Sequence, residues 1–557
     1  MNLLTSMAGE DDLAIISGEK GVTWKNLQER VYRLANGLYD DLGIRKRDKV
    51  AYMLYNSNEF LEVLIGASIL GCPAPMINWH LKGDELEYVI GKLESKAETL
   101  ILDRDFLKNV VDIRDRLENI KNYIVVGEKA PDGMILYEDL LKRSSSAKPK
   151  ECYSFVGLEL FTAGTTGLPK TLNWAENISS YLFGKLPWGP AHSFKEIRKS
   201  NPVAPINMRY MLERYLIPIM KTAGLLDWDK KADVGIVTAP LYHAGAIIGF
   251  IPLLFGGTLV MMKKFDAEEF LRLVDKEKAT FSFVAPILLQ RILKLPEEVK
   301  EKYDLSSFRA FVCAAAPCPP EVKKSINELF TRQGAPGPVF HEYYGSSDGG
   351  YVTTLAPRDY LADPKKYESV GVILPNQVKI LDENGRECLP GVIGAVHECG
   401  NLSMMSTFPG ALDRYEGLFK EIDGELCWVD EGLLGYRDED NFLYLVGRTK
   451  DIIISGGVNI YPDEIENVIL KHPKVVDAAV IGVPDKEWGE SVKACVQLKE
   501  GETATEEEII GYCNKYLSGY KRPKSVDFFD ELPRHTDGKI IKRKLKDEYW
   551  KGIERHG

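Results

Sequence analysis

The sequence lacks several features that mark secreted, membrane or metal-binding proteins. Its nine cysteines are scattered over 557 residues without pairs at metal-ligand spacing. Reduced thiols in a cytosolic protein are the simplest account of them. The first residues, Met1 to Asp12, contain no basic stretch followed by an apolar core, so we expect no secretory signal. These absences predict a cytoplasmic protein.

An excess of basic residues is also missing. The formal net charge is −11, which argues against nucleic acid or an anionic membrane as the main partner. One long apolar run spans Ala244 to Met262, but Pro252 and the Gly256–Gly257 pair interrupt it. We therefore predict a buried helix, a turn and a buried strand there, and no membrane span.

The chain is too long for one compact core, so two or more domains are expected. In its N-terminal half, helix-like and strand-like patterns alternate. Helical spacing at Thr23–Leu42 and Glu59–Leu70 is followed each time by a short apolar run, at Lys49–Leu54 and Pro73–Ile77. This rhythm predicts an α/β domain with mixed, largely parallel sheets flanked by helices.

Further along, strand-like runs at Val378–Leu381, Ala395–Cys399 and Leu443–Val446 predict a β-rich subdomain. The last hundred or so residues restart as a small unit. Strands are expected at Asp477–Ile481 and Val492–Leu498, and a helix at Glu506–Tyr516. A small α+β C-terminal domain should therefore follow the large one.

The segment from Thr162 to Lys170 concentrates hydroxyl groups, glycines and a lysine behind the apolar run Leu158–Phe161. Glycines let successive N–H groups point inward and form a nest for an anion. The pattern differs from a P-loop, in which Gly-Lys-Ser/Thr opens a helix. We predict a phosphate-binding loop made by Thr162, Gly164, Thr165, Thr166, Gly167 and Lys170.

This string resembles the signature of the adenylate-forming superfamily, which includes acyl-CoA synthetases, luciferases and peptide-synthetase adenylation domains. The resemblance extends from about Val22 to Lys544, with further motifs in the expected order. It implies an N-terminal domain, residues 1–447, that holds ATP and the acyl group, and a mobile C-terminal domain, residues 448–557. It also implies ATP, Mg²⁺ and CoA as ligands.

Two strings resemble the adenine-binding motifs of that superfamily. One contains Ala315, Ala316 and Pro317, whose small side chains permit a flat base to approach the backbone. The other runs from Glu342 to Asp348. In it the resemblance implies that Tyr344 stacks on adenine, that Ser347 meets the α-phosphate, and that Asp348 binds Mg²⁺. Its remaining candidate nucleotide-site residues are Glu342, Tyr343 and Gly345.

Pro240–Gly245 resembles the segment that lines the acyl pocket in the family. Its His243 is either a packed core histidine or a residue that contacts the acyl group. Between the phosphate loop and this segment the chain is long for the family. An inserted helical segment is expected around Ser193 to Leu225.

Two later motifs resemble the hinge and the C-terminal domain. In the first, Arg448 corresponds to the ribose contact and Lys450 to the hinge position. The turn formed by Ser455, Gly456 and Gly457 corresponds to the pantetheine route. In the second, Lys539 corresponds to the lysine that bridges the carboxylate and the α-phosphate, so Lys539 and Lys170 are the catalytic candidates.

The chain departs from the family pattern at three places. Ala163 replaces a usual Ser, and Thr171 stands where Gly usually follows the lysine. The third matters more, because Leu433 occupies the position of an Asp that grips both ribose hydroxyls. Hydrogen bonds to a charged group contribute about 1.5–3 kcal/mol each. Asp430 or Glu431 is a candidate substitute if the strand is bulged.

The sequence thus predicts an AMP-forming acid–thiol ligase that activates a fatty or other apolar acid and transfers it to CoA. Two alternatives remain. One is a ligase that loads a carrier-protein thiol, and the other is a non-catalytic relative, for which Leu433 is the main support. A homodimer is one possible assembly.

Overall fold

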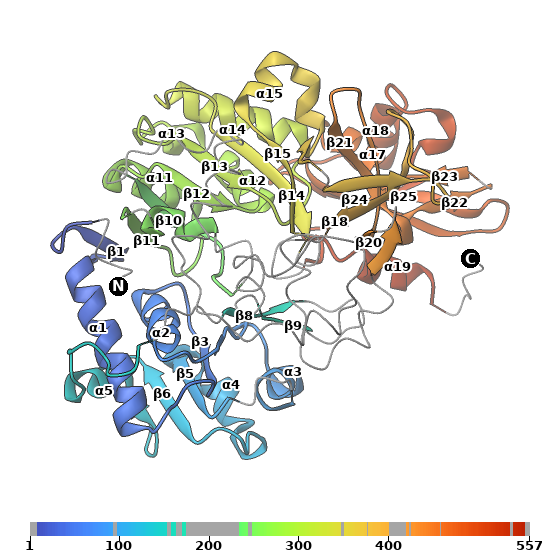
Figure 1. The fold of residues 1–557 in the computed structure, drawn as a ribbon. Coiled ribbons are helices and arrows are strands. Elements are labelled where there is room, and N and C mark those ends of the chain that lie inside the picture. Colours follow the sequence, from blue (N-terminus) through green and yellow to red (C-terminus); the bar gives the residue numbers. More distant parts are fainter. Residues whose placement is uncertain are drawn as a thin grey trace.

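We describe the protein from a computed structural model. The structure describes residues 8–92, 97–152, 158–162, 170–173, 233–242, 248–254, 256–346, 350–375, 377–399, 419–422, 425–456, 458–534 and 539–551. Within these ranges the strands form four sheets (Figure 1).

The largest sheet begins with a parallel half whose strand order is β1-β11-β10-β12-β13-β14, with β2 at its edge. Helices α11, α12 and α14 alternate with these strands and contribute to its buried apolar core. The strands are β1 (Leu13–Ser17), β2 (Lys20–Thr23), β10 (Val234–Val237), β11 (Thr258–Met261), β12 (Phe281–Val284), β13 (Ala310–Cys313) and β14 (Phe340–Ser346), and the helices are α11 (Ala267–Glu277), α12 (Pro286–Leu293), α13 (Glu297–Lys300) and α14 (Pro320–Arg332).

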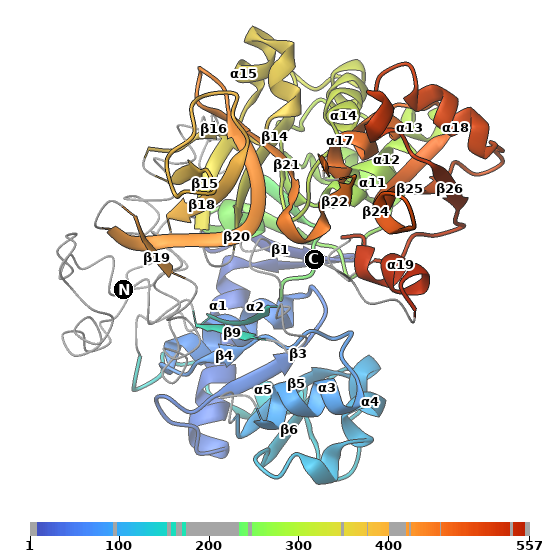
Figure 2. The same cartoon turned by 90° about the vertical axis from the view of Figure 1, so that its right-hand side faces the viewer.

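The same sheet continues as an antiparallel half in the order β14-β15-β16-β21-β20-β18-β17. Figure 2 shows these strands gathered together, and this half is the β-rich subdomain expected from the sequence. Its elements are β15 (Gly350–Leu355), α15 (Pro357–Ala362), β16 (Gly371–Ile373), β17 (Val378–Leu381), β18 (Gly394–Cys399), β19 (Phe419–Ile422), β20 (Glu425–Arg437) and β21 (Phe442–Arg448).

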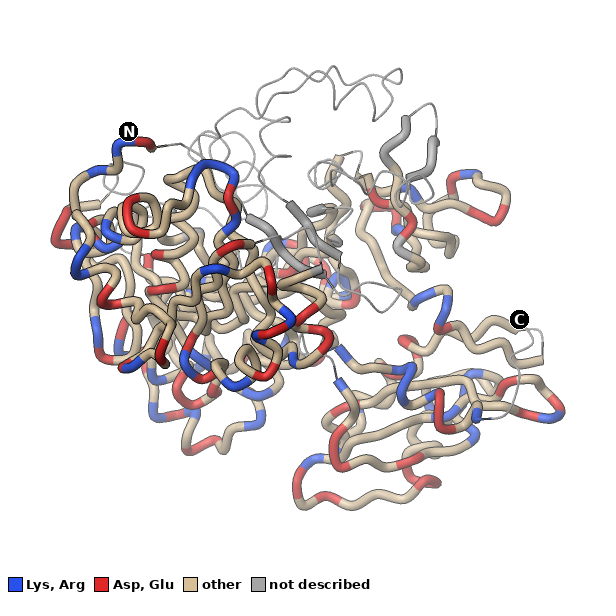
Figure 3. Tube along the Cα trace, turned by 90° about the horizontal axis from the view of Figure 1, so that it is seen from below, with Lys and Arg blue, Asp and Glu red and all other residues tan. Residues whose placement is uncertain are grey.

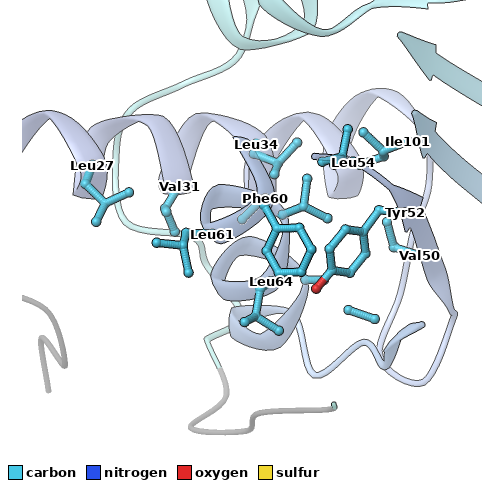
Figure 4. Packing of buried hydrophobic residues seen from close by; sticks show 14 of the residues in the cluster. Leu27, Val31, Leu34, Val50, Tyr52, Leu54, Phe60, Leu61, Leu64 and Ile101 are labelled. Atoms are coloured by element: carbon cyan, nitrogen blue, oxygen red, sulfur yellow. The ribbon is translucent and has the colours of Figure 1, made fainter. Parts of the chain in front are cut away.

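The N-terminal helices pack face to face beside a parallel sheet of order β3-β5-β6-β7. Helix α1 begins where the Thr23 side chain accepts a hydrogen bond from the N–H of Asn26. Its apolar stripe, including Leu27, Val31 and Leu34, packs against α2 in the core drawn in Figure 4. The elements are α1 (Trp24–Asn36), β3 (Val50–Met53), α2 (Asn58–Ile69), β4 (Ala74–Pro75), α3 (Gly83–Glu87), β5 (Thr99–Asp103), α4 (Leu107–Val111), β6 (Asn122–Val126), β7 (Ile135–Leu136) and α5 (Tyr137–Arg143).

The phosphate-loop segment is described only at its two ends. Strands β8 (Leu158–Thr162) and β9 (Lys170–Asn173) pair antiparallel, with Thr162 opposite Lys170, and β8 also pairs with β4. A hairpin therefore brings the two ends of the predicted loop together, as a loop that folds back on itself requires.

The described part of the long apolar run folds as the sequence predicts. A short helix, α10 (Ile251–Leu254), and the strand β11 lie on either side of the turn at Gly256 and Gly257. Among the helices of the described residues, none combines the length and the apolar character needed to cross a membrane.

The C-terminal residues build a fourth sheet of order β23-β22-β25-β24, with β26 beside β25. It has its own apolar core, to which α17 and α18 contribute. The elements of this C-terminal part are β22 (Ile453–Ser455), β23 (Val458–Ile460), α17 (Pro462–Ile469), β24 (Val475–Asp485), β25 (Gly489–Leu498), α18 (Glu506–Cys513), β26 (Ser525–Phe528) and α19 (Lys542–Tyr549).

Figure 3 shows acidic and basic residues interspersed along the trace, and neither sign dominates one side in that view.

Candidate nucleotide and acyl site

The two predicted adenine strings meet at one edge of the large sheet. Strands β13 and β14 are parallel neighbours, with Cys313 paired to Glu342, so the residues just after Cys313 lie beside the residues of β14 just after Glu342. Ala315 is exposed at this edge and has a φ of 78°, which is unusual for a residue with a side chain. Ala315 is exposed and has only a methyl side chain, so a flat base can approach its backbone closely.

Glu342 points away from the edge into the interior. It forms a buried ion pair with Lys323 of α14, and the Lys323 ammonium also donates to the Ser369 carbonyl at 2.9 Å. Burial raises the pKa of Glu342, and the charge of Lys323 partly offsets that rise. In this structure Glu342 therefore anchors β14 to α14, whereas the sequence predicted it as a nucleotide-site residue.

The next two residues of β14 face opposite sides, as strand geometry requires. The Tyr343 ring lies 6.5 Å from the Phe283 ring and packs on the apolar cluster that includes Ala314. Tyr344 is half-buried and packs on the cluster around Val396, and its hydroxyl donates to the carboxylate of Glu398.

The predicted ribose end lies on β20 and β21, where Leu433 pairs directly with Arg448. Opposite β18 the strand is bulged, since residues 431–433 face the single residue Val396 between the pairs Ala395–Leu434 and His397–Asp430. The bulge on which the Asp430 hypothesis depends is therefore present. Asp430 itself accepts the N–H of Gly432 at 2.8 Å, within that bulge.

The predicted hinge follows β21 directly. Arg448 and Lys450 are exposed, and Asp451 lies 3.6 Å from the ammonium of Lys546 on α19. At the next turn the Gly456 N–H donates to the Trp488 carbonyl, and a Cβ at Gly456 would lie 2.5 Å from the Trp488 ring. Trp488 is half exposed, so an aromatic side chain covers the predicted pantetheine turn.

Lys539 lies next to a β-bridge among the C-terminal residues. Its neighbour Ile540 pairs with Arg534, and Arg534 forms an ion pair with Asp477. Arg534 is close enough to Lys294 for its charge to lower the pKa of that lysine, together with the larger effect of burial. Lys294 follows the end of α12, which begins at the carboxyl edge of the sheet and runs back to the opposite edge. These contacts hold Ile540, the neighbour of Lys539, beside the C-terminal sheet, and the role of Lys539 stays a prediction.

Several predicted residues lie outside the described part of the chain or lack a described side chain. Within the described residues, no group of three or more His, Cys, Asp or Glu is arranged to hold a metal ion. The inserted segment predicted around residues 193–225 also lies outside the described residues. Outside the description are Gly164, Thr165, Thr166, Gly167, His243, Ser347, Asp348 and Gly457, while Thr162 and Lys170 are described by their backbone alone.

Sequence reasoning missed the residues that hold this site from behind. Lys323 and Glu398 are charged residues inside helix and strand patterns, and such charges usually face solvent. Only their burial, 2% and 0% exposed, reveals that they point inward. For Trp488 the sequence offers only a weak signal of a turn, because this residue precedes a glycine between two strand-like runs.

Comparison with known proteins identifies the family of this chain. The sequence profile "AMP-binding enzyme" matches residues 6–174 and 205–407, and "AMP-binding enzyme C-terminal domain" matches residues 464–539. Indoleacetate–CoA ligase of Aromatoleum aromaticum is 30% identical over 95% of this chain and 93% of its own. The mitochondrial medium-chain acyl-CoA ligase ACSF2 of Mus musculus is 28% identical over 96% and 84%.

The fold is shared with a solved relative. The anthranilate CoA ligase AuaEII, in complex with anthranoyl-AMP, aligns with a TM-score of 0.77 at 22% identity, over 96% of this chain and 94% of that one. Enzymes of this family use ATP, Mg²⁺ and CoA. The chain belongs to the AMP-binding enzyme family, the adenylate-forming superfamily, and is an AMP-forming CoA ligase of the acyl-CoA synthetase type.

Proposed function

We propose that this enzyme activates an apolar carboxylic acid as its acyl-adenylate and transfers the acyl group to CoA. The observation that carries this proposal is the pairing of Cys313 with Glu342, which brings the Ala315 string beside Tyr344 on β14, with an apolar cluster on the other face of β14. One strand thereby separates a nucleotide side from an acyl side.

Apolar residues line the proposed acyl side. The cluster beneath Tyr343 consists of aromatic and aliphatic side chains from β12 and β13, among them Phe283 and Val312. Leu241 and Tyr242, which open the predicted acyl segment, are buried beyond the end of β10. Apolar side chains of this kind favour an aryl or alkyl acid over a diacid.

We assign the polar roles as the family resemblance implies. Thr162, Gly164, Thr165, Thr166, Gly167 and Lys170 hold the β- and γ-phosphates, Ser347 meets the α-phosphate, and Asp348 is the Mg²⁺ ligand. Arg448 contacts the ribose. Both reactants are anions, so positioning and neutralisation of charge are the main tasks of these residues.

A panel of acids tests the proposal. We expect pyrophosphate release and an acyl-CoA product, identified by mass, with indole-3-acetate, a cinnamate or octanoate, and little with malonate. Turnover of malonate above all apolar acids would refute the assigned class. Pyrophosphate without any CoA thioester would favour a carrier-protein thiol as acceptor. No pyrophosphate with any acid, despite measurable ATP binding, would favour the non-catalytic alternative.

The predicted role of Lys539 makes a second, independent test. The family resemblance assigns Lys539 to adenylation and implies that the C-terminal residues rotate about Lys450 between the two half-reactions. We expect Lys539→Ala to abolish pyrophosphate release while sparing thioester formation from supplied acyl-adenylate. Lys544→Ala, an exposed lysine nearby, is the matched control and should leave both halves intact. Equal loss of both halves in Lys539→Ala would contradict the role.

A further inference from the structure

A buried carboxylate lies behind the predicted adenine-stacking residue. Glu398 is near the end of β18, and its side chain is fully buried. It accepts a hydrogen bond from the hydroxyl of Tyr344 on β14. The family resemblance assigned no role to Glu398, and the proposed reaction does not use it.

The contact depends on the shape of the whole sheet. From β14 to β18 the sheet order passes through β15, β16, β21 and β20, which is five steps. In a flat sheet, five steps of about 4.8 Å would separate the strands by roughly 24 Å. The two side chains touch because the sheet curls around an apolar cluster that includes Val370, Val396 and Leu443. Glu398 therefore reaches Tyr344 across the interior of this curl.

A fully buried carboxylate is costly unless it is hydrogen-bonded, because burial removes it from water. Here the Tyr344 hydroxyl supplies one such bond. The same bond restricts the aromatic ring, since the phenol oxygen is held at one end and the backbone at the other. The Tyr344 N–H also donates to the Thr353 hydroxyl at 3.2 Å, which holds the backbone end.

We propose that Glu398 is a positioning residue for nucleotide binding, because it holds the Tyr344 ring in the orientation that stacks on adenine. This inference rests on the proposed function, in which Tyr344 is the stacking residue. Leu433, at the position of the usual ribose carboxylate, packs on the same apolar cluster as Tyr344.

Three variants test this role: Glu398→Leu, which removes the acceptor; Glu398→Gln, which keeps one; and Tyr344→Phe, which removes the donor. AMP affinity is measured by calorimetry, the KM for ATP and kcat by pyrophosphate release, and folding by thermal unfolding. We expect Glu398→Leu and Tyr344→Phe each to weaken AMP binding and raise the KM for ATP by about tenfold, with kcat little changed. Glu398→Gln should remain within a few-fold of wild type.

The double variant Glu398→Leu/Tyr344→Phe provides the decisive comparison. Its loss should be no greater than that of either single variant, because both remove the same hydrogen bond. Additive losses, or a lower unfolding temperature of Glu398→Leu with unchanged nucleotide affinity, would overturn the inference. If Glu398→Leu does not fold, the Tyr344→Phe variant decides alone. Unchanged AMP affinity of Tyr344→Phe would then overturn the inference. Absence of pyrophosphate with every acid would refute the proposed function, while AMP binding would still test Glu398.

Discussion

Leu433 and Arg448 occupy paired positions on β20 and β21, so the side chain at 433 lies beside the predicted ribose contact. Leu433 is partly buried and packs on the apolar cluster that also supports Tyr344. An apolar residue therefore contributes to the packing of the site at the place where the family carries a charge. Which residue then holds the ribose can be tested by restoring that charge.

We expect Leu433→Asp to lower the KM for ATP by roughly tenfold or more, because hydrogen bonds to a charged group are worth about 1.5–3 kcal/mol. The steady-state KM for ATP at saturating acid measures the effect. Leu433→Asn has nearly the same shape without the charge and should recover only part of it. An unchanged KM in Leu433→Asp would mean that another residue, such as Asp430, already binds the ribose.

A second residue-scale prediction concerns Gly456, whose φ of 58° and closeness to Trp488 both disfavour a side chain. We expect Gly456→Ala to slow thioester formation and to destabilise the C-terminal unit by more than the roughly 1–2 kcal/mol of a left-handed alanine. Gly501→Ala is the matched control, because Gly501 has a φ of 78° and nothing within 4 Å of an added Cβ. Equal destabilisation of the two variants would exclude a contribution from Trp488.

At the scale of elements, β14 connects the parallel and antiparallel halves of the large sheet, and successive side chains of β14 pack on different apolar clusters. Phe340, Glu342 and Tyr344 belong to one face, and His341 and Tyr343 alternate with them. His341 is 6% exposed, and its Nδ1 lies 3.3 Å from the Val339 carbonyl oxygen. Burial lowers the pKa of His341 from 6.5 to about 4.

The sign of the resulting pH effect follows from this shift. Between pH 6.5 and 4 the unfolded chain binds a proton at His341 and the folded chain does not. The stability that neutral His341 contributes is therefore complete above pH 6.5 and lost as the pH falls toward 4, by roughly 3 kcal/mol at 1.36 kcal/mol per pKa unit. We expect the urea midpoint of wild type to fall more from pH 7 to pH 4.5 than that of His341→Gln. Parallel declines would contradict this assignment.

For the molecule as a whole, the connection between η8 (Thr449–Asp451) and α19 relates the hinge to the end of the chain. Lys546 is 6% exposed and lies 3.6 Å from Asp451, while Lys542 on the same helix lies 2.8 Å from Glu466 of α17. These pairs hold the last described helix against Asp451, next to the hinge position, and against α17, all within the residues that rotate in the proposed cycle.

We expect Lys546→Met to loosen the hinge, so that trypsin cleaves after Lys450 several-fold faster in the native protein. The cleavage rate, followed by mass spectrometry of the fragments, measures local opening of η8. Lys551→Met is the control, because exposed Lys551 pairs only loosely with Glu548, at 3.8 Å. Equal cleavage rates in the two variants would show that Lys546 does not hold the hinge.

Local patterns predicted many elements of the described fold. Helical spacing predicted α1 and α2, and apolar runs predicted β3, β17, β18, β24 and β25, because each pattern reflects which face a single element buries. The order of the motifs predicted the family. The boundary between 447 and 448 and the individual site roles remain predictions.

What the sequence by itself determined is therefore the family, its reaction type and the elements on which the site stands, since these depend on short strings and on periodicity. Tertiary structure alone decided where buried charges point. The ion pair of Lys323 with Glu342 and the bond of Tyr344 to Glu398 join residues 19 and 54 positions apart in the sequence. Only the packing of α14 on β14 and the curl of the sheet bring these partners together, and no local pattern contains that information.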